Sequence, residues 1–575
     1  MGLLTNPNTD ETSKIVTLLQ KHGQRLGVVS YVAGIIWLGF LANVEYNMKT
    51  YFSENALLPG LVVENFGGGH RAENYLNQLL EKDDKSETGV SAEYLQQLFL
   101  KIGLSEVELQ NYTFIDPVTK NETDALRGTN VFAVLRAKRA AGTESLVFNA
   151  PYFPRHISSR KNLASIALML ALAEYFQSQV YWAKDIVFLV AEGHIGTLAW
   201  VKGHQEMVDS QDNLKFERVR TKAGNIQAAI NVIMEGNNVC GLETKFHGIN
   251  GQLPNLDFVN LLNKFIVSDA DKRPDWERDV WKLINYMQIQ ATGTPTGSHG
   301  FFLKYGIESI TMTGKTSKAC KLRNGFTFGD MGRILEAVFR SLNNLLERLH
   351  QSFFFYLKTT PNRFISISLY FPPLALIIFP ILLKGASTWL TKKDLSATQG
   401  LFRLMAIHSV AVFLRWSLNN LNQIIRRLPI SPNFEITNEI FMLTVLGIIA
   451  FQFLFAKLLL RKSDENLIDS LYCFCLLEFA TSLYSLALFN PSLVILLGTV
   501  SAPIVTLLFM FQPKQRIWLF GLINAILVGA VIKYYAVLEN PINKYFFEAD
   551  VYGNFLFDYA LLVVVPVVST ITAIV

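Results

Sequence analysis

The chain has 575 residues, of which 50% are apolar and only 17% are charged, and its mean hydropathy is +0.26. A soluble protein carries about 25% charged residues, so this composition excludes a simple water-soluble globule. The 42 Phe and 20 Tyr exclude a disordered or coiled-coil chain. The net charge is +5 without a dense basic block, which gives nucleic-acid binding no support. The sequence therefore predicts a multi-domain membrane protein with no nucleic-acid partner.

The first apolar stretch covers residues 26–44 (LGVVSYVAGIIWLGFLANV) and contains no charged residue. It is long enough to cross about 30 Å of hydrocarbon as a helix. It is longer than the apolar core of a cleaved signal peptide, and no small-residue cleavage site follows it. We predict an uncleaved transmembrane anchor at 26–44, behind a cytoplasmic segment at 1–25.

Seven further spans are predicted in a transmembrane bundle at 359–575, which gives eight spans in total. They are expected at 364–383, 404–425, 440–460, 467–489, 493–511, 517–537 and 555–575. Lys and Arg are more frequent in the short connections on the side of the N-terminus, which predicts a cytoplasmic N-terminus. The large segment 45–358 then lies in the lumen or outside the cell.

Two glycosylation sequons fall in the segment at 45–358, at Asn111 and Asn121, and they agree with that orientation. Of the four cysteines, Cys240 and Cys320 could pair in an oxidising lumen, but the sequence alone does not decide this.

The segment 45–358 has the pattern of an α/β domain. Strands are predicted at 129–136, 144–150, 185–191, 226–234 and 307–312, with helices at 68–82, 160–178, 197–208, 255–267 and 275–289. Strands that alternate with helices favour a mostly parallel or mixed sheet covered on both faces. One long amphipathic helix is expected from 330 to 357, leading into the bundle.

The order of these elements resembles a zinc aminopeptidase-like sheet, in which Asp, Glu and His side chains at strand ends hold two metal ions. The positions of those ligands read Pro151-Tyr152-Phe153, Lys161-Asn162, Ala191-Glu192-Gly193, Ile233 and His299. Only Glu192 and His299 keep a metal-binding side chain, whereas zinc sites need three or four protein ligands. His194, directly after a strand, is most simply a loop residue. We therefore expect a degenerate site with no metal and no cofactor.

Several long segments resemble one family: MGLL, SYVAGIIW, TYFSENALLPG, GTNVFAVLRAKRAAGTESLV, QVYWAKDIVFLVAE, GINGQLPNLDFVNL, GSHGFFLKYGIES and NNLLERLHQSFFFYL. Together they resemble the glycosylphosphatidylinositol (GPI) anchor attachment proteins, the large multi-span (Gaa-type) subunit of GPI transamidase. The resemblance implies a complex in the endoplasmic reticulum membrane that removes a C-terminal signal from a precursor protein and joins its new carboxyl end to a GPI lipid. It also implies partner subunits, among them a caspase-like cysteine protease that carries the catalytic thiol.

The expected role is that of a non-catalytic subunit, which assembles the complex and presents the GPI lipid and perhaps the precursor. The alternative is a metal-dependent amide synthase or peptidase that acts directly through the α/β domain, with Glu192 and His299 as its remaining ligands.

Lipid contacts are hypothesised just beyond the anchor, at Tyr51, Ser53, Glu54 and Asn55, because a carboxylate could attract the ethanolamine ammonium of the lipid. The alternative is that these residues cap a helix. His350 would approach the same surface from the other side, although a solvated or docked helix face is the favoured interpretation of this residue.

Within the bundle, Glu478 needs a partner at membrane depth, and Arg415 is the expected one, as a structural pair or a lipid site. Pro566 would bend the last span and border a lipid-sized cleft.

Overall fold

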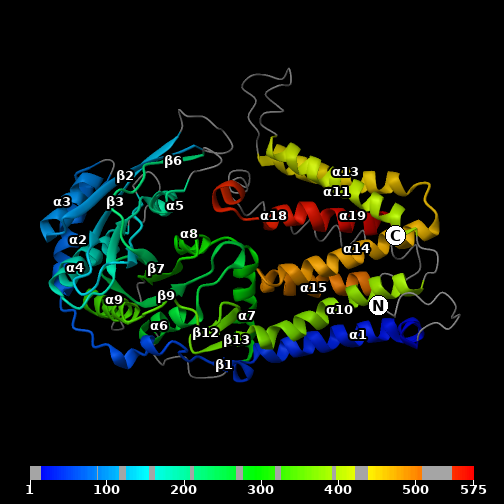
Figure 1. The fold of residues 1–575 in the computed structure, drawn as a ribbon, viewed down its shortest axis with the longest axis horizontal. Coiled ribbons are helices and arrows are strands. Elements are labelled where there is room, and N and C mark those ends of the chain that lie inside the picture. Colours follow the sequence, from blue (N-terminus) through cyan, green and yellow to red (C-terminus); the bar gives the residue numbers. More distant parts are fainter. Residues whose placement is uncertain are drawn as a thin grey trace, which may run out of the picture.

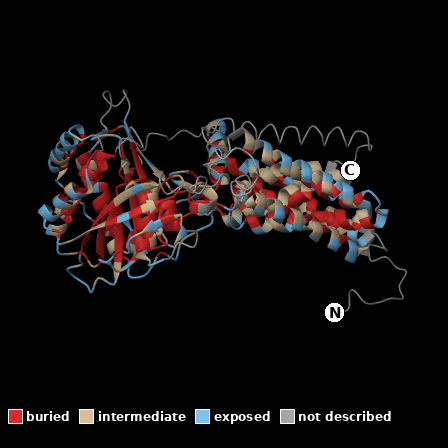
Figure 2. Cartoon of the chain, turned by 90° about the horizontal axis from the view of Figure 1, so that it is seen from above, coloured by how far each residue is buried: buried red, intermediate tan, exposed pale blue. Residues whose placement is uncertain are grey.

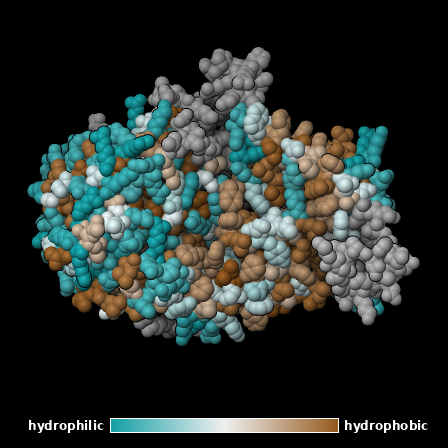
Figure 3. Space-filling view, viewed as in Figure 1, coloured by the Kyte–Doolittle hydropathy of each residue, from teal (hydrophilic) through white to brown (hydrophobic). Residues whose placement is uncertain are grey.

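The computed structural model describes residues 14–86, 89–115, 125–153, 162–207, 213–266, 276–316, 325–391, 396–420, 438–507 and 547–574. They form an α/β domain and a bundle of roughly aligned helices at one end of it (Figure 1). Hydrophilic residues cover much of the visible face of the α/β domain, whereas hydrophobic residues dominate the bundle (Figure 3). This contrast is typical of a domain in water attached to helices in lipid.

The α/β domain is built on an eight-stranded mixed sheet. Its strand order is β6 (Leu214–Phe216), β2 (Glu106–Phe114), β3 (Leu126–Leu135), β5 (Asp185–Val190), β4 (Glu144–Asn149), β7 (Asn225–Met234), β10 (Glu308–Lys315) and β9 (Gly241–Lys245). The central strands β5, β4, β7 and β10 are parallel, and the outer pairings are antiparallel. The five predicted strands and the mixed sheet are confirmed. Because the central strands are parallel, their carboxyl ends meet at one edge.

Helices cover both faces of the sheet, as predicted. On one face lie α4 (Leu163–Ser178) and α9 (Phe328–Asn343), and on the other α5 (Gly193–His204) and α8 (His299–Lys304). Nearly every residue of α4 is buried, since α2 (Gly69–Asp84) covers its outer side. The remaining elements are α3 (Ala92–Ile102), α6 (Leu256–Ile266), α7 (Trp276–Ala291) and the short pair β8 (Asn238–Val239) and β11 (Phe326–Thr327). Figure 2 shows the buried sheet between these layers.

The single helix expected over 330–357 is wrong. Helix α9 ends at Asn343, whose side chain turns away to accept hydrogen bonds from the Ala183 and Lys184 amides. A β-hairpin follows, made of β12 (Tyr356–Thr360) and β13 (Arg363–Ser366). Strand β1 (Met48–Lys49), just after the anchor, pairs with β13. The resulting three-stranded sheet ties the start of the α/β domain to its end, next to the bundle (Figure 1).

Six described helices are long and apolar enough to cross a membrane. Five of them lie within α1 (Lys14–Ala42), α10 (Ile367–Thr391), α11 (Ala397–Asn419), α13 (Asn438–Leu460) and α14 (Glu465–Leu486). The sixth is the continuous run of α18 (Leu556–Tyr559), η8 (Ala560–Val564) and α19 (Val565–Ile574). A shorter apolar helix, α15 (Pro491–Leu507), lies at the span predicted over 493–511. The span predicted over 517–537 lies outside the described residues. Helix α11 begins and ends earlier than the span predicted over 404–425, and Asn420 is its C-cap residue.

Prolines inside the spans free backbone carbonyls, and polar side chains of neighbouring helices bond to them. Proline lacks the N–H that would bond the carbonyl four residues earlier. Pro380, Pro503 and Pro566 therefore free Leu376, Thr499 and Leu562. The carbonyl of Leu376 accepts from Ser30 Oγ (2.8 Å), that of Thr499 from Tyr31 Oη (2.8 Å), and that of Leu562 from His408 Nδ1 (2.9 Å).

Candidate functional site

Side-chain amides occupy the carboxyl edge of the central strands, where enzymes of this architecture place their chemistry. Asn162, which precedes α4 with a left-handed backbone (φ 59°), uses its whole amide. Its Nδ2 donates to the carbonyls of Pro151 (2.8 Å) and Val232 (3.0 Å), and its Oδ1 accepts from the Met234 amide (2.9 Å). Asn162 therefore joins the segment that follows β4 to the end of β7 instead of offering a metal ligand.

A second amide pair lies in the sheet itself. Asn149 Nδ2 donates to Asn231 Oδ1 (2.7 Å), and Asn231 Nδ2 donates to Ser309 Oγ (3.0 Å) and the Ile310 carbonyl (3.1 Å). These residues come from β4, β7 and β10, so the amides link three neighbouring strands. Neither asparagine was predicted as a site residue, although both lie within predicted strands.

Glu192 follows β5, as predicted, but its carboxylate bonds to the backbone of β3. Its Oε2 accepts from the Thr129 amide (2.8 Å). The Glu192 amide donates to Asn130 Oδ1 (3.0 Å), and the Glu192 carbonyl accepts from Tyr112 Oη (2.9 Å). These hydrogen bonds fix the start of α5 against β3, so Glu192 has a structural role.

His299 is fully buried, and both its ring nitrogens have protein partners. Nε2 lies 3.0 Å from the His247 carbonyl oxygen and Nδ1 lies 2.7 Å from Thr311 Oγ1. The carbonyl accepts only, so the ring proton is assigned to Nε2, and Nδ1 accepts from the hydroxyl. Burial lowers the pKa of His299 to about 3, so the imidazole is neutral at pH 7. His194 bonds Ser298 Oγ through Nδ1 (2.8 Å), and Ser298 is the residue directly before His299 at the start of α8.

The side chains at the predicted ligand positions do not fit a two-zinc site. Tyr152 accepts a hydrogen bond from the Val90 amide, Asn162 is fully bonded, and Ile233 offers no ligand atom. Over the described ranges of the chain, no three His, Cys, Asp or Glu side chains are grouped to hold a metal ion. The donors that zinc prefers are thus replaced by amides and a tyrosine.

Glu54 and His350, two of the residues in the lipid-contact hypothesis, are in contact in the structure. Glu54 Oε1 accepts from the backbone amides of His350 and Gln351 (both 3.1 Å), and its carboxylate is buried. Asp257 Oδ2 accepts in turn from the Ser53 and Glu54 amides (both 2.8 Å). The Glu54 carboxylate therefore links the segment after α1 to the segment around His350. Tyr51, Asn55 and the His350 side chain are exposed nearby.

The remaining predicted positions are placed as follows. Asn111 is exposed on β2, whereas Asn121 and Cys320 lie outside the described residues. Cys240 is disulfide-bonded. Cys473 and Cys475 are buried free thiols in α14.

The expected pair of Arg415 and Glu478 is wrong. Glu478 pairs with His408 (3.0 Å), while Arg415 pairs with Asp558 of α18. His408 and Arg415 are two turns apart on α11, about 10 Å along its axis, so each reaches a different acid. Because His408 also bonds the Leu562 carbonyl freed by Pro566, both pairs tie the last span to α11 and α14.

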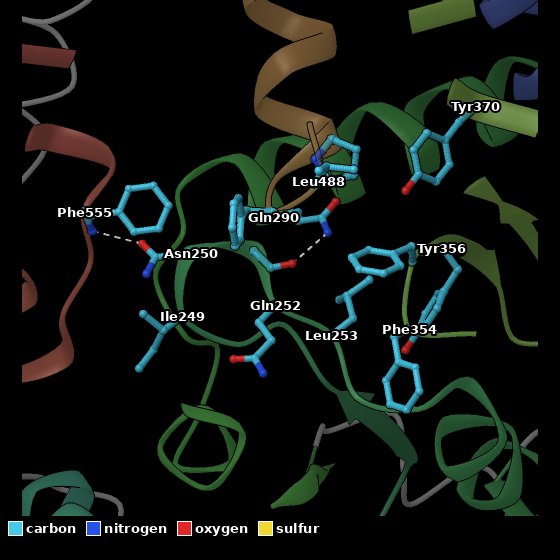
Figure 4. Close-up of a pocket in the computed structure, with 14 residues that line it drawn as sticks. Ile249, Asn250, Gln252, Leu253, Gln290, Phe354, Tyr356, Tyr370, Leu488 and Phe555 are labelled. Carbon is cyan, nitrogen blue, oxygen red and sulfur yellow. Dashed lines mark hydrogen bonds between the residues drawn. The ribbon is translucent and has the colours of Figure 1, made fainter. Parts of the chain in front are cut away.

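A cavity of about 590 Å³ lies where the α/β domain meets the bundle (Figure 4), and we call it the junction cavity. Its lining is mostly apolar and aromatic: Ile249, Asn250, Gly251, Gln252, Leu253, Gln290, Phe354, Phe355, Tyr356, Tyr370, Leu488, Phe489, Pro491 and Phe555. The volume is within the range of small-molecule sites. None of the hypothesised lipid-contact residues lines it.

Polar groups of the junction cavity hold its walls together, with one exception. Gln290 bonds the Gly251 carbonyl (3.0 Å) and Ser492 Oγ (2.5 Å), and Asn250 bonds the Phe555 amide (3.0 Å). Tyr370, at the start of α10, is fully buried, and its hydroxyl has no hydrogen-bond partner in the part of the chain that the structure describes. A buried, unpaired hydroxyl costs about 1–3 kcal/mol, so it marks a place where a ligand oxygen could bind.

Comparison with protein families decides the identity of the chain. The family model described as "Gaa1-like, GPI transamidase component" matches residues 127–572, more than half of the sequence. The chain belongs to the Gaa1-like family of GPI transamidase components. The resemblance described above is thereby confirmed, and the matched range contains the strand-edge amides and every residue of the junction cavity.

Two yeast members of the Gaa1-like family are similar over much of this chain. GPI transamidase component gaa1 of Schizosaccharomyces pombe is 29% identical over 401 residues, which cover 66% of each protein. GPI transamidase component GAA1 of Saccharomyces cerevisiae is 27% identical over 367 residues, covering 59% of this chain and 53% of the relative. The matched region thus spans about two thirds and about half of these relatives.

Solved structures with a similar fold cover about half of this Gaa1-like chain. A glutaminyl cyclase from Fimbriiglobus ruber is 14% identical, covers 49% of this chain and 97% of its own, and has a TM-score of 0.34. The zinc aminopeptidase BSAP from Bacillus subtilis is 10% identical, covers 51% and 99%, and has a TM-score of 0.31.

Proposed function

We propose that this chain is a non-catalytic subunit of GPI transamidase that holds the GPI lipid and presents it to a catalytic thiol on a caspase-like partner subunit. The complex would reside in the endoplasmic reticulum membrane, with the N-terminus of this chain cytoplasmic and its α/β domain in the lumen. The second substrate would be a precursor protein with a C-terminal GPI signal, which the assembled complex would bring to the lipid.

The observation that carries this proposal is the junction cavity. Its walls combine the start of α10 and the turn between α14 and α15 with loops of the α/β domain, so it lies at the height where a bilayer meets water. A GPI lipid has acyl chains in the bilayer and a phosphate-linked glycan above it. The apolar walls suit the acylglycerol part, and the Tyr370 hydroxyl supplies one donor to an ester or phosphate oxygen.

Chemistry on this chain has weaker support. A metal-dependent amide synthase would need ligands at the strand edge, where Asn162, Glu192 and His299 are already committed to hydrogen bonds within the protein. The two described free cysteines lie inside α14, at membrane depth, where they would not meet a peptide in the lumen. Binding and presentation therefore account for the arrangement better than catalysis.

The proposal predicts that filling the junction cavity releases lipid. Leu488→Trp adds an indole at the cavity wall and should lower the amount of GPI lipid that co-purifies with the full chain. Tyr370→Phe removes one hydrogen bond to the lipid, worth about 0.5–1.5 kcal/mol. This substitution should lower the amount of co-purifying GPI lipid by roughly 2–12-fold. The measurement is quantitative mass spectrometry of lipid extracted from the purified chain.

Tyr484→Phe is the matched control, because it removes a tyrosine hydroxyl that bonds the Ala375 carbonyl (2.9 Å) outside the cavity. This variant should retain lipid as the unchanged chain does. If well-folded Leu488→Trp protein, judged by its elution profile and melting temperature, carries as much GPI lipid as the unchanged chain, the junction cavity is not the lipid site.

A further inference from the structure

Helix α7 (Trp276–Ala291) lies across the ends of the spans rather than along them (Figure 1). It packs against α1 and α15 on the bundle side and against β12 on the domain side. Gln290 lies near the C-terminal end of α7. Its carbonyl accepts from Asn490 Nδ2 (2.8 Å) and its Oε1 accepts from Ser492 Oγ (2.5 Å), both at the start of α15. These contacts fix α7 at the height of the membrane surface on the side of the α/β domain.

The helix has one packed face and one open face. Asp279, Leu283, Tyr286, Met287 and Gln290 follow helical spacing and are buried. Trp281, Asn285 and Gln288 lie on the opposite face and are exposed. Since the bundle and β12 are both contacted by the packed face, the open face is directed away from the protein at that height.

Two tryptophans are the notable exposed groups of α7. Trp281, on the open face, is 62% exposed. Trp276, the first residue of the helix, is 65% exposed, although its spacing from Asp279 and Leu283 places it on the side of the packed face. The other two described tryptophans of the α/β domain, Trp182 and Trp200, are almost completely buried. Large aromatic side chains are rarely left this exposed to water, whereas Trp and Tyr are enriched at the boundary between a bilayer and water. Among the described tryptophans of the α/β domain, exposure is thus confined to the helix that lies at the membrane surface.

We propose that α7 is a membrane-interface helix, which rests in the lipid headgroup layer with the indoles of Trp276 and Trp281 in contact with lipid. The occupant of this surface is the bilayer that surrounds the spans. Other exposed aromatic side chains occur at the same end of the bundle: Tyr46 just after α1 and Phe489 just after α14, with exposures of 60% and 62%. The two indoles therefore extend an aromatic belt from the spans onto the α/β domain. By fixing the height and tilt of α7, they would hold the α/β domain at a set distance from the bilayer.

The test places a photoreactive phenylalanine (p-benzoyl-phenylalanine) at position 281 of the full chain, in cells that supply its partners and are fed an alkyne-tagged fatty acid. After irradiation, the purified chain is probed for tagged lipid and for protein adducts. The matched control carries the same group at Leu100, an exposed residue (50%) of α3, on the side of the domain remote from the spans (Figure 1). A second variant with the group at position 276 repeats the measurement.

We expect several-fold more tagged lipid on positions 281 and 276 than on position 100, with no discrete protein adduct. A discrete protein adduct at 281 and 276 would show that a partner subunit covers this face and would overturn the proposal. Labelling no greater than at position 100 would show that the face is in water and would also overturn it. This test does not depend on the junction cavity, because a helix in the interface meets bulk lipid whether or not GPI is bound.

Discussion

At the scale of single residues, Asn162 illustrates how a position suited to a metal ligand serves structure instead. Its amide donates two hydrogen bonds and accepts one, and all three partners are backbone groups. A carboxylate can accept but cannot donate when ionised. An aspartate at this position would therefore face two carbonyl oxygens without a proton to offer.

Asn162→Asp should destabilise the protein by about 1–3 kcal/mol, the cost of leaving buried polar groups without partners. The measurement is the melting temperature of the purified full chain in detergent. Asn74→Asp, at an exposed position of α2, is the control and should have little effect. An unchanged melting temperature in Asn162→Asp would contradict the structural role assigned to this amide.

The buried histidines predict a loss of stability in acid. Burial lowers the pKa of His299 to about 3 and that of His247 to about 4, below the ordinary value of 6.5. The folded state then binds fewer protons than the unfolded state, so stability is fully present above pH 6.5 and falls as the pH drops below it. The difference in melting temperature between the unchanged chain and His299→Gln should narrow from pH 7 to pH 5. A constant difference would contradict a neutral, buried His299.

The sequence predicted where Glu192 and His299 lie but not what they bond. Their positions follow from strand ends, which apolar periodicity reveals. Their partners, Thr129, Thr311 and the His247 carbonyl, come from segments whose approach depends on the whole sheet. For the same reason Asn149 and Asn231 were not predicted as a linked pair. The role of a polar residue in a buried strand cannot be inferred until its neighbour on the adjacent strand is known.

At the scale of elements, the helices of the bundle are joined where prolines free a carbonyl. Such groups need a partner in lipid, where water is absent. Ser30 and Tyr31 of α1 serve Leu376 and Thr499, and His408 of α11 serves Leu562. The position of Pro566 in the last span therefore coincides with a hydrogen bond between helices.

Pro566→Ala and His408→Ala should be energetically coupled. Alanine at 566 restores the amide that bonds the Leu562 carbonyl, so removing His408 should cost about 1 kcal/mol less in that background. A double-mutant cycle on melting temperatures in detergent measures this coupling. Pro380→Ala is the control for Pro566→Ala, because the carbonyl it concerns bonds Ser30 rather than His408. Additive effects of Pro566→Ala and His408→Ala would contradict the account.

The sequence predicted the strands and helices of the α/β domain well because their periodic patterns are strong. It failed at 330–357, where a regular apolar pattern continues beyond the end of α9. The Pro361-Asn362 pair and the β-branched residues around it are typical of a hairpin, and the prediction of one long helix did not use that pattern. The partner of Arg415 was predicted wrongly because Arg415 lies two helical turns from His408 on α11. Arg415 therefore lies at a different depth in the membrane and pairs with Asp558, whereas His408 pairs with Glu478.

At the scale of the whole molecule, the junction cavity is assembled from segments that are far apart in the chain. Its walls come from the η4 turn (Ile249–Gly251), α7, the loop before β12, α10, the α14–α15 turn and Phe555. No local pattern could have marked these residues as one site. Only the docking of the α/β domain on the bundle brings them together, at the boundary between the two environments.

The central claim is that this chain holds lipid for chemistry done elsewhere, and Glu192→Gln tests it most directly. Glutamine keeps an oxygen to accept the Thr129 amide but removes the only carboxylate among the predicted metal-ligand positions. The variants are expressed in cells that lack their own copy of this subunit. Glu192→Gln should restore surface display of a GPI-anchored reporter to near the level of the unchanged chain, whereas Leu488→Trp should not.

Loss of a catalytic base or metal ligand would instead slow the reaction by about 100-fold or more. If Glu192→Gln is present at normal levels in the membrane and yet displays no reporter, the chemistry belongs to this chain and the account is contradicted.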